Sequence, residues 1–232
     1  MSRERKRDHG SGVPRRESAA ARRERALRIE KGLAETYPDA TCELDFQNAW
    51  QLLVATILSA QCTDKMVNQV TPALFEEFPG PAELAVAPAS RVEELIRKTG
   101  FYRQKTKSIV VCAQRIVDDF DGQVPHTLEE LTTLPGVGRK TASVVVGTAY
   151  GQPAVFVDTH VKRLSKRLAL TKADDPDDVE TDLKDLLPVD VWTAFCHRMI
   201  HHGRRVCSAR KPRCESCTLA DSCPRIGVES SI

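Results

Sequence analysis

The sequence has no apolar run long enough to cross a lipid bilayer. Its longest such run, LLVATILSA at residues 52–60, falls well short of the roughly 20 apolar residues that a transmembrane helix needs. Residues 1–12 are mostly charged or polar and contain no apolar core, so we do not expect them to be a secretory leader. These two absences predict a cytoplasmic protein with no membrane partner.

Convincing alternation of apolar and polar residues, with the period of two that a half-buried β-strand shows, is also missing. Short segments with helical spacing fill the chain instead, separated by Pro, Gly and Asp. The segment 48–61 is apolar on almost every face, and 155–170 is apolar on one face. Thr127 and Glu130 have the spacing of a helix capping box. The predicted fold class is therefore all-α.

Charge is nearly balanced overall but unevenly distributed. The formal net charge is +2, yet residues 1–31 hold eleven Lys and Arg against five Asp and Glu. A second basic run covers 204–213, and the acidic segment 173–185 lies between the two. Such local basic runs suit a polyanionic partner. Residues 1–20 are predicted to be a disordered basic tail, either a solvated arm or a nucleic-acid-binding arm.

The eight cysteines do not indicate a disulfide framework in a chain of this length and expected location. Four are scattered in apolar surroundings and are expected to be small buried residues: Cys42, Cys62, Cys112 and Cys196. The other four have the spacing C-x6-C-x2-C-x5-C followed by Pro, and we predict that they ligate metal: Cys207, Cys214, Cys217 and Cys223. Zinc suits four thiolates, but zinc ribbons usually separate two close pairs. A single compact loop with a Cys-Pro ending favours an iron–sulfur cubane.

The stretch TLPGVGRKTASVVVG at 133–147 joins two helical segments through a Leu-Pro-Gly-Val-Gly turn. Its glycines permit positive φ and leave out side chains, so backbone N–H groups can approach an anion closely. The helix that follows adds its free N-terminal donors and its positive dipole end. The turn is predicted to hold a nucleic-acid phosphate without reading sequence, and an ordinary tight turn is the alternative. The predicted DNA-binding residues are Leu134, Gly136, Val137 and Gly138.

Lys140 lies in the first turn of that second helix. A lysine is electrostatically misplaced there, because the backbone at a helix N-terminus is already positive. The helix end and neighbouring cations disfavour the ammonium form, and a neutral amine is a nucleophile. The alternative reading of Lys140 is a solvated surface lysine.

Four motifs carry a resemblance to a known family: ILSAQCTDK, LPGVGRKTA, VDTHVKRL and the cysteine loop. They resemble the endonuclease III family of helix-hairpin-helix DNA glycosylases, which has a Gly/Pro…Asp signature and an iron–sulfur site. The motifs stand in the family's order and at family-like spacings between about residues 22 and 225.

The resemblance implies a bilobed all-α enzyme with damaged double-stranded DNA as its partner. Residues 42–152 would form a six-helix barrel ending in the hairpin, and 21–41 with 153–232 would form a second domain. That domain would carry a [4Fe–4S] cluster on the four cysteines, with a basic loop braced against phosphate by Arg210, Lys211 and Arg213. The resemblance further implies a monomer, associated with the nucleoid in a bacterial cytoplasm.

The family's catalytic groups correspond to Lys140 and Asp158. Lys140 would attack the sugar C1′ of the damaged nucleotide, displace the base and form a Schiff base. Asp158 would stabilise positive charge at the sugar and assist Lys140, and it is also a plausible helix N-cap. Abstraction of a C2′ proton would then permit β-elimination of the 3′ phosphate. His160, close to Asp158, is interpreted as structural.

The resemblance also places the SAQCTD stretch and a second loop against DNA. Gln61 would fill the space left by the flipped nucleotide, and Asp64 would line the pocket that receives it. Phe101 stands where the family suggests an aliphatic wedge, and a phenylalanine can insert between bases equally well.

Oxidised pyrimidines are the substrates that the resemblance implies. Two alternatives share the fold: an adenine glycosylase, which normally lacks the lysine, and an enzyme specific for pyrimidine dimers. A third is a noncatalytic iron–sulfur module that binds DNA or senses redox state. Replacing Lys140 or Asp158 would leave the activity of that module unchanged.

Overall fold

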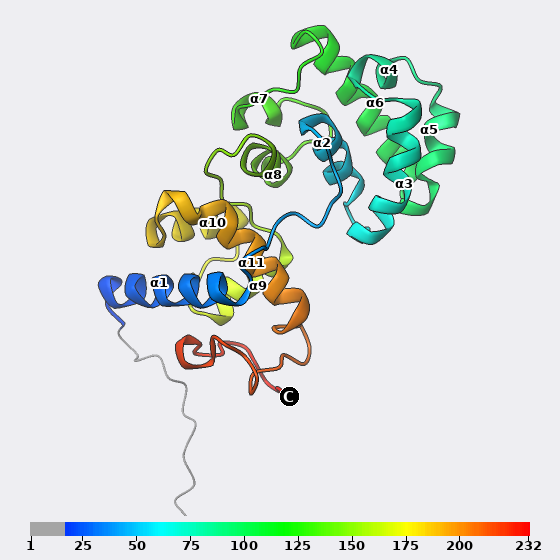
Figure 1. The fold of residues 1–232 in the computed structure, drawn as a ribbon. Helices are drawn as coiled ribbons and strands as arrows, with labels where there is room; N and C mark the ends of the chain where they lie inside the picture. Colours follow the sequence, from blue (N-terminus) through cyan, green and yellow to red (C-terminus); the bar gives the residue numbers. More distant parts are fainter. Residues whose placement is uncertain (1–16) are drawn as a thin grey trace, which may run out of the picture. The chain divides into compact units, whose positions relative to one another are not determined.

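The computed structural model describes residues 17–232 of the chain, and every regular element among these residues is a helix (Figure 1). The all-α prediction is confirmed. None of the helices in this described range is both long and apolar enough to span a membrane. The predicted tail at 1–20 lies largely outside the described residues. Its last residues were predicted wrongly, because Ser18 caps a helix that begins at Ala19.

The chain divides into two compact units, and each is described by itself. One unit is Cys42–Phe156. The other combines the described residues up to Thr41 with Val157–Ile232. The second unit is therefore assembled from segments that lie far apart in the sequence.

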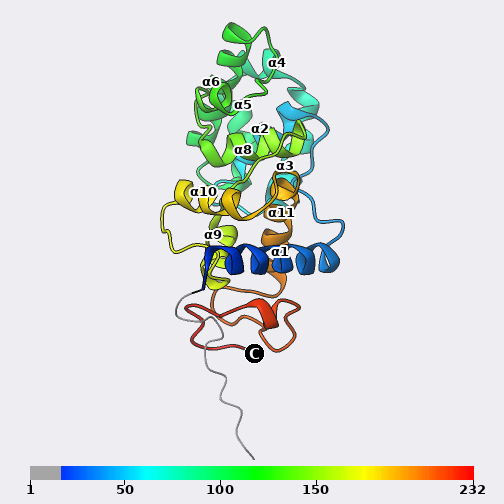
Figure 2. The same cartoon turned by 90° about the vertical axis from the view of Figure 1, so that its left-hand side faces the viewer.

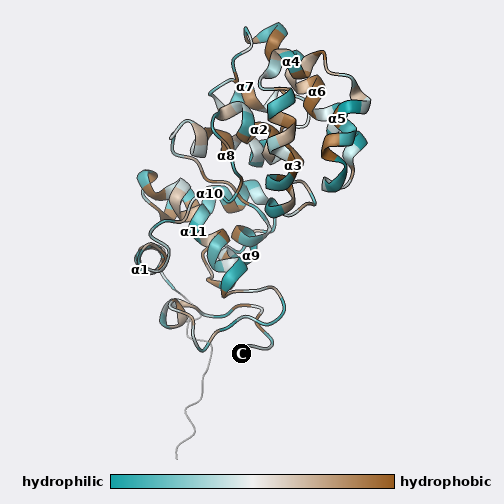
Figure 3. Ribbon diagram, turned by 45° about the vertical axis from the view of Figure 1, so that its right-hand side comes forward, coloured by the Kyte–Doolittle hydropathy of each residue, from teal (hydrophilic) through white to brown (hydrophobic). Residues whose placement is uncertain are grey.

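The unit Cys42–Phe156 is built around one apolar helix. Its elements are α2 (Ala49–Leu58), α3 (Asp64–Glu77), α4 (Pro81–Ala85), α5 (Ala89–Ile96), the 3-10 turn η1 (Arg97–Thr99), α6 (Tyr102–Asp119), α7 (Leu128–Thr132) and α8 (Arg139–Ala149). Every residue of α2 from Leu52 to Leu58 is buried, and the helix packs against α3, α6 and α8. Apolar residues gather on the facing sides of these helices (Figure 3). This burial explains why the sequence of α2 shows almost no polar face.

The second unit packs a long N-terminal helix against helices from the C-terminal half of the chain (Figure 2). Its elements are α1 (Ala19–Thr36), α9 (Thr159–Arg167), α10 (Pro176–Leu186), the 3-10 turn η2 (Val189–Val191), α11 (Trp192–Arg205) and the 3-10 turn η3 (Ala220–Ser222). Helix α11 contacts both α1 and α9. The prediction of a helix across 155–170 was too long at its start. Val155–Val157 is a buried non-helical segment, and α9 begins only after Asp158.

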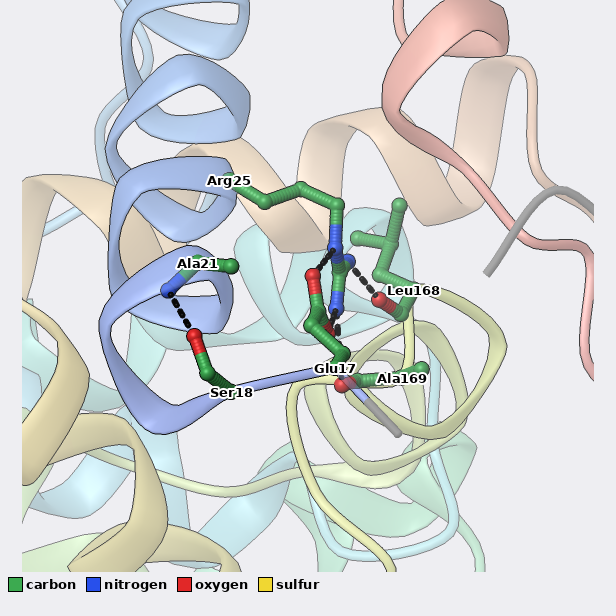
Figure 4. A network of polar contacts seen from close by, with 6 residues as sticks. All are labelled: Glu17, Ser18, Ala21, Arg25, Leu168 and Ala169. Atoms are coloured by element: carbon green, nitrogen blue, oxygen red, sulfur yellow. Dashed lines mark hydrogen bonds and ion pairs between the residues drawn. The ribbon is translucent and has the colours of Figure 1, made fainter. Parts of the chain in front are cut away.

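A buried arginine joins α1 to the end of α9 (Figure 4). Arg25 forms an ion pair with Glu17 at 2.8 Å and donates hydrogen bonds to the carbonyls of Leu168 and Ala169. These carbonyls follow the last turn of α9, where backbone acceptors have no partner within the helix. Arg25 therefore caps α9 from a position 143 residues away in the sequence.

Candidate nucleic-acid interface and metal centre

The turn between α7 and α8 requires glycine at Gly136 for two separate reasons. Its φ is +79°, in the left-handed region. A Cβ atom at this position would also lie 2.9 Å from the Cβ of Ser108 on α6. The turn is closed by the Val137 N–H, which donates to the Leu134 carbonyl at 3.1 Å. The side chains of Leu134 and Val137 are buried, so the turn can meet a ligand only through its backbone and glycines.

Helix α8 begins at the end of this turn without a side-chain cap. Gly138 is the N-cap residue, and a Cβ atom added to it would meet nothing within 4 Å. The protein itself therefore leaves open space at Gly138, where an external group can approach the start of α8. Lys140, the second residue of α8, is exposed beside this space. A helix N-terminus next to an exposed amine is an arrangement that attracts an anion.

Gln61 and Phe101, the two residues predicted to insert into DNA, have strained backbones. Their φ values are +51° and +47°, in the left-handed region that costs a residue with a side chain about 1–2 kcal/mol. Both residues are exposed, and the Phe101 side chain is an apolar ring that is 67% exposed to solvent. Strain of this kind persists where the surrounding structure holds a residue in place, and it concentrates at functional sites.

A lysine outside the set of predicted site residues holds the Phe101 loop. Lys105 is buried on α6, and its Nζ donates to the Thr99 carbonyl at 2.8 Å. Its backbone N–H donates to the Phe101 carbonyl at 3.0 Å. Burial lowers the pKa of Lys105. Lys105 therefore binds the backbone both before Phe101 and at Phe101 itself. The sequence around Lys105 gives no sign of this contact.

Asp64 and Asp158 both lie at helix N-termini. Asp64 is the half-buried first residue of α3, where a carboxylate is favoured by the helix dipole. Asp158, in the other unit, is the N-cap of α9, and its Oδ1 accepts from the Val161 N–H at 2.7 Å. The cap predicted for Asp158 is confirmed. The cap directs one carboxylate oxygen to the helix and holds the side chain in a defined position.

The four clustered cysteines line one cavity. Apolar side chains including Leu164, Leu219 and Val228 complete its wall. Among the described residues 17–232, no three His, Cys, Asp or Glu side chains are grouped so as to hold a single metal ion, and the four thiols instead surround the cavity. Burial raises the pKa of Cys217, and it raises that of Cys223 to about 11. Thiolates at these two positions therefore need the positive charge of bound metal, which an iron–sulfur cubane supplies.

Hydrogen-bond donors approach two of the sulfur atoms. Nη1 of Arg167 lies 3.3 Å from Sγ of Cys207, and Nε2 of His202 lies 3.5 Å from Sγ of Cys217. The other ring nitrogen of His202 lies 3.0 Å from the Tyr37 hydroxyl. Donors to ligand sulfurs are the usual second layer of an iron–sulfur site and tune the cluster held there. The donor set and the cavity fit a cubane cluster.

The loop between the first two cysteines presents its cations to solvent. The three basic residues predicted to contact DNA are all exposed: Arg210, Lys211 and Arg213. The Ser208 hydroxyl donates to the Lys211 carbonyl at 2.7 Å, and the Arg213 N–H donates to the Val206 carbonyl at 3.0 Å. These bonds give the loop a defined shape next to the cysteines.

Two family models match the chain. Residues 54–189 match the HhH-GPD superfamily of base excision DNA repair proteins, and residues 207–223 match the iron–sulfur binding domain of endonuclease III. The first match covers the hairpin, Lys140 and Asp158, and the second covers the four cysteines. The fold and the site thus define a helix-hairpin-helix protein of base excision repair with a [4Fe–4S] cluster.

Comparison with individual relatives identifies the family within this class. The endonuclease III of Synechocystis sp. is 55% identical over 206 residues, which cover 88% of this chain and 94% of the relative. A solved non-covalent endonuclease III–DNA complex superimposes with a TM-score of 0.83 at 44% identity, covering 87% of this chain and 94% of that chain. A trapped covalent endonuclease III–DNA intermediate gives the same TM-score and identity, and the match covers 87% of this chain and 95% of that chain. The chain belongs to the endonuclease III family.

Proposed function

We propose that this protein removes oxidised pyrimidines from damaged double-stranded DNA and cleaves the strand on the 3′ side of the resulting abasic site. Its general class follows from the family, since endonuclease III proteins are DNA glycosylases and AP lyases of base excision repair. The observation that carries the specific proposal is the position of Lys140. This exposed amine lies in the first turn of α8, two residues after Gly138.

In the proposed reaction, the Nζ of Lys140 attacks C1′ of the damaged nucleotide. The C1′–N glycosidic bond breaks, and the base leaves with the bonding electron pair and a proton. Ring opening and loss of the amine proton leave a Schiff base between Nζ and C1′. A base then removes a C2′ proton, the electrons of that C–H bond form a C2′=C3′ double bond, and the 3′ phosphate leaves with the C3′–O electron pair. Hydrolysis of the Schiff base finally regenerates the lysine.

Asp158 is the proposed electrostatic partner of this chemistry. Positive charge develops at the sugar as the glycosidic bond breaks, and a fixed carboxylate stabilises it. The N-cap bond from Asp158 to Val161 supports this role, because it restrains the side chain and leaves the second carboxylate oxygen for other partners. Asp158 would assist Lys140 either through this electrostatic effect or by proton transfer.

The exposed loops of Cys42–Phe156 are the proposed DNA-binding elements. Gln61 would occupy the space of the flipped nucleotide, Asp64 would line the pocket, and Phe101 would insert between bases. The hairpin backbone from Leu134 to Gly138 would hold a phosphate. Arg210, Lys211 and Arg213 would add phosphate contacts, with the cluster supporting their loop when it is bound.

We further propose that the protein acts as a monomer in a bacterial cytoplasm, associated with the nucleoid. Bacterial relatives cover most of this chain at high identity, which supports the bacterial assignment. Single-chain action is supported by the supply of both proposed catalytic residues and the metal ligands from one chain.

The test of the proposed function is borohydride trapping on duplex DNA that contains thymine glycol. Borohydride reduces the Schiff base to a stable amine, so the wild-type protein should become covalently attached to DNA. Lys140→Ala should give no adduct and should still bind the duplex. Lys172→Ala, which removes an exposed lysine of the other unit, is the matched control and should be trapped like the wild type.

The remaining outcomes separate the alternatives. Release of the base by the wild type without an adduct would mean a monofunctional glycosylase that uses water. Binding with neither release nor adduct would exclude thymine glycol as a substrate, and the same assay on a pyrimidine dimer would then follow.

A further inference from the structure

Helix α9 is attached to the cysteine loop by two arginines on one of its faces. Arg163 and Arg167 are four residues apart, so they lie on the same side of the helix. The N-cap of this helix is Asp158. The helix therefore has the proposed catalytic carboxylate at its start and contacts with the metal-ligand segment along its length.

Arg163 connects the first turn of α9 to the segment around the first cysteine. Its Nη2 lies 3.0 Å from the carbonyl of Cys207, 3.1 Å from that of Gly203 and 3.2 Å from Nδ1 of His160. Nη2 carries two hydrogens, which suffice for the two carbonyls, and Nδ1 of His160 lies in close contact with the same nitrogen. Nη2 of Arg163 thus contacts both His160, two positions after Asp158, and the backbone of the cluster ligand Cys207.

Arg167 attaches the last turn of the same helix. Besides its contact with Sγ of Cys207, its guanidinium donates to the carbonyl of Ser208 at 2.7 Å and to that of Ala209 at 2.6 Å. Its own backbone carbonyl accepts from the Ile226 N–H at 3.1 Å, just beyond the last cysteine. The loop is therefore bound to α9 on both sides of the cysteine motif.

The Arg163 contact depends on a glycine. Gly203 on α11 leaves the space that the contact occupies. A Cβ there would lie 2.8 Å from Nδ1 of His160 and 3.1 Å from Nη2 of Arg163.

We propose that Arg163 is a positioning residue that transmits the folded state of the cysteine loop to Asp158. When the loop is folded around its cluster, the Cys207 carbonyl is fixed, and Arg163 and His160 hold the first turn of α9. The cap between Asp158 and the Val161 N–H is kept intact by that turn. When the loop is released, the turn frays and the carboxylate loses its fixed position. The consequence for catalysis rests on the role proposed for Asp158.

The backbone amide of Val161 can be used to measure this link. The Val161 N–H donates to Oδ1 of Asp158, so its hydrogen exchange measures the opening of the cap. In the wild-type protein, removing iron with a chelator should speed exchange at Val161 roughly five- to tenfold, the effect of losing one modest hydrogen bond. Unchanged exchange at Val161 after iron removal would overturn the proposal.

Substitution of the link tests it in the iron-loaded protein. Arg163→Met should retain the visible absorption of the cluster and speed exchange at Val161. It should lower kcat on thymine glycol DNA on the order of tenfold or more, because a displaced catalytic group loses its alignment. The Kd for a duplex with a non-cleavable abasic analogue should stay the same. Lys166→Met, which removes a cation of α9 that pairs with Asp174, is the matched control and should change neither exchange nor kcat.

Gly203→Ala provides a second perturbation that keeps both arginines. It should displace His160 and Arg163 and reproduce the effects of Arg163→Met, so the test stands even if the arginine variant fails to fold. Wild-type exchange and kcat in both variants would refute the link. Asp158→Asn separates the two proposals: if that variant is fully active, the role of Asp158 is wrong, while exchange at Val161 still decides whether the link exists.

Discussion

The two glycines of the hairpin should respond differently to the same substitution. Gly136 combines a φ of +79° with a Cβ position 2.9 Å from Ser108, whereas Gly138 has a φ of −87° and open space around its Cβ position. In Gly136→Ala, the left-handed backbone costs about 1–2 kcal/mol and the forced contact with Ser108 about 1–3 kcal/mol. The free energy of unfolding should therefore fall by about 2–5 kcal/mol.

Gly138→Ala creates neither strain nor contact within the protein. Alanine is only a poorer N-cap than glycine, which should lower the free energy of unfolding by less than about 1 kcal/mol. The added methyl group does occupy the space through which a phosphate would approach α8. We expect this variant to fold almost normally and to bind DNA on the order of tenfold more weakly, since it loses about one charge-assisted hydrogen bond.

The assay is urea unfolding followed by circular dichroism, paired with DNA binding at one fixed salt concentration. If Gly136→Ala unfolds at the wild-type urea concentration, the close approach to Ser108 plays no role in stability. If Gly138→Ala binds DNA as tightly as the wild type, the hairpin backbone does not contact phosphate. The interpretation of this turn as an anion-binding site would then be wrong.

Three further predictions concern strain, a buried thiol and a buried ion pair. Phe101→Gly should raise the free energy of unfolding by about 1 kcal/mol, because a φ of +47° suits glycine. The same variant should lower glycosylase activity, because it lacks the ring that inserts between bases. If it is as active as the wild type, Phe101 does not contact DNA. Burial raises the pKa of the Cys112 thiol from 9.0 to about 12, because the folded protein disfavours the thiolate. The neutral thiol therefore contributes its full stability below pH 9, and this contribution is lost as the pH rises through 12. Between pH 8 and 10.5 the urea stability of the wild type should therefore fall by about 2 kcal/mol more than that of Cys112→Val, and equal losses would contradict the burial. Arg25→Met should lower the free energy of unfolding by about 2 kcal/mol, because Glu17 and two carbonyls lose their donor, whereas Arg28→Met in an exposed pair should have little effect; thermal melts of both variants compare them directly.

Local chemistry made several elements predictable. Thr127 accepts from the Glu130 N–H at 3.2 Å, as the cap spacing predicts, although the Glu130 carboxylate accepts from the Thr127 hydroxyl at 2.7 Å instead of completing the reciprocal box. Asp158 caps α9 for the same local reason. Helix caps and glycine turns depend on residues within a few positions of one another, so one sequence suffices to find them.

Helix boundaries were less predictable where apolar residues continue past a helix. The segment 155–170 has the apolar face of a helix, yet Val155–Val157 is a buried non-helical connection. Burial alone explains its apolar residues, so periodicity cannot separate the two states there. The same ambiguity extended the prediction for α2 to residue 61, whereas the helix ends at Leu58 and Gln61 adopts positive φ.

Four features could be recognised without any coordinates: the all-α class, the hairpin with its glycines, the lysine that follows them and the four-cysteine motif. Each of these is written in residues that are neighbours along the chain. Which cations stabilise the interior became known only from the packed helices. Arg163 meets Cys207 across 44 residues, and Arg25 meets Leu168 across 143, and neither arginine differs locally from one exposed to solvent. Such pairings depend on how helices pack, because the partner is a backbone carbonyl that every residue possesses.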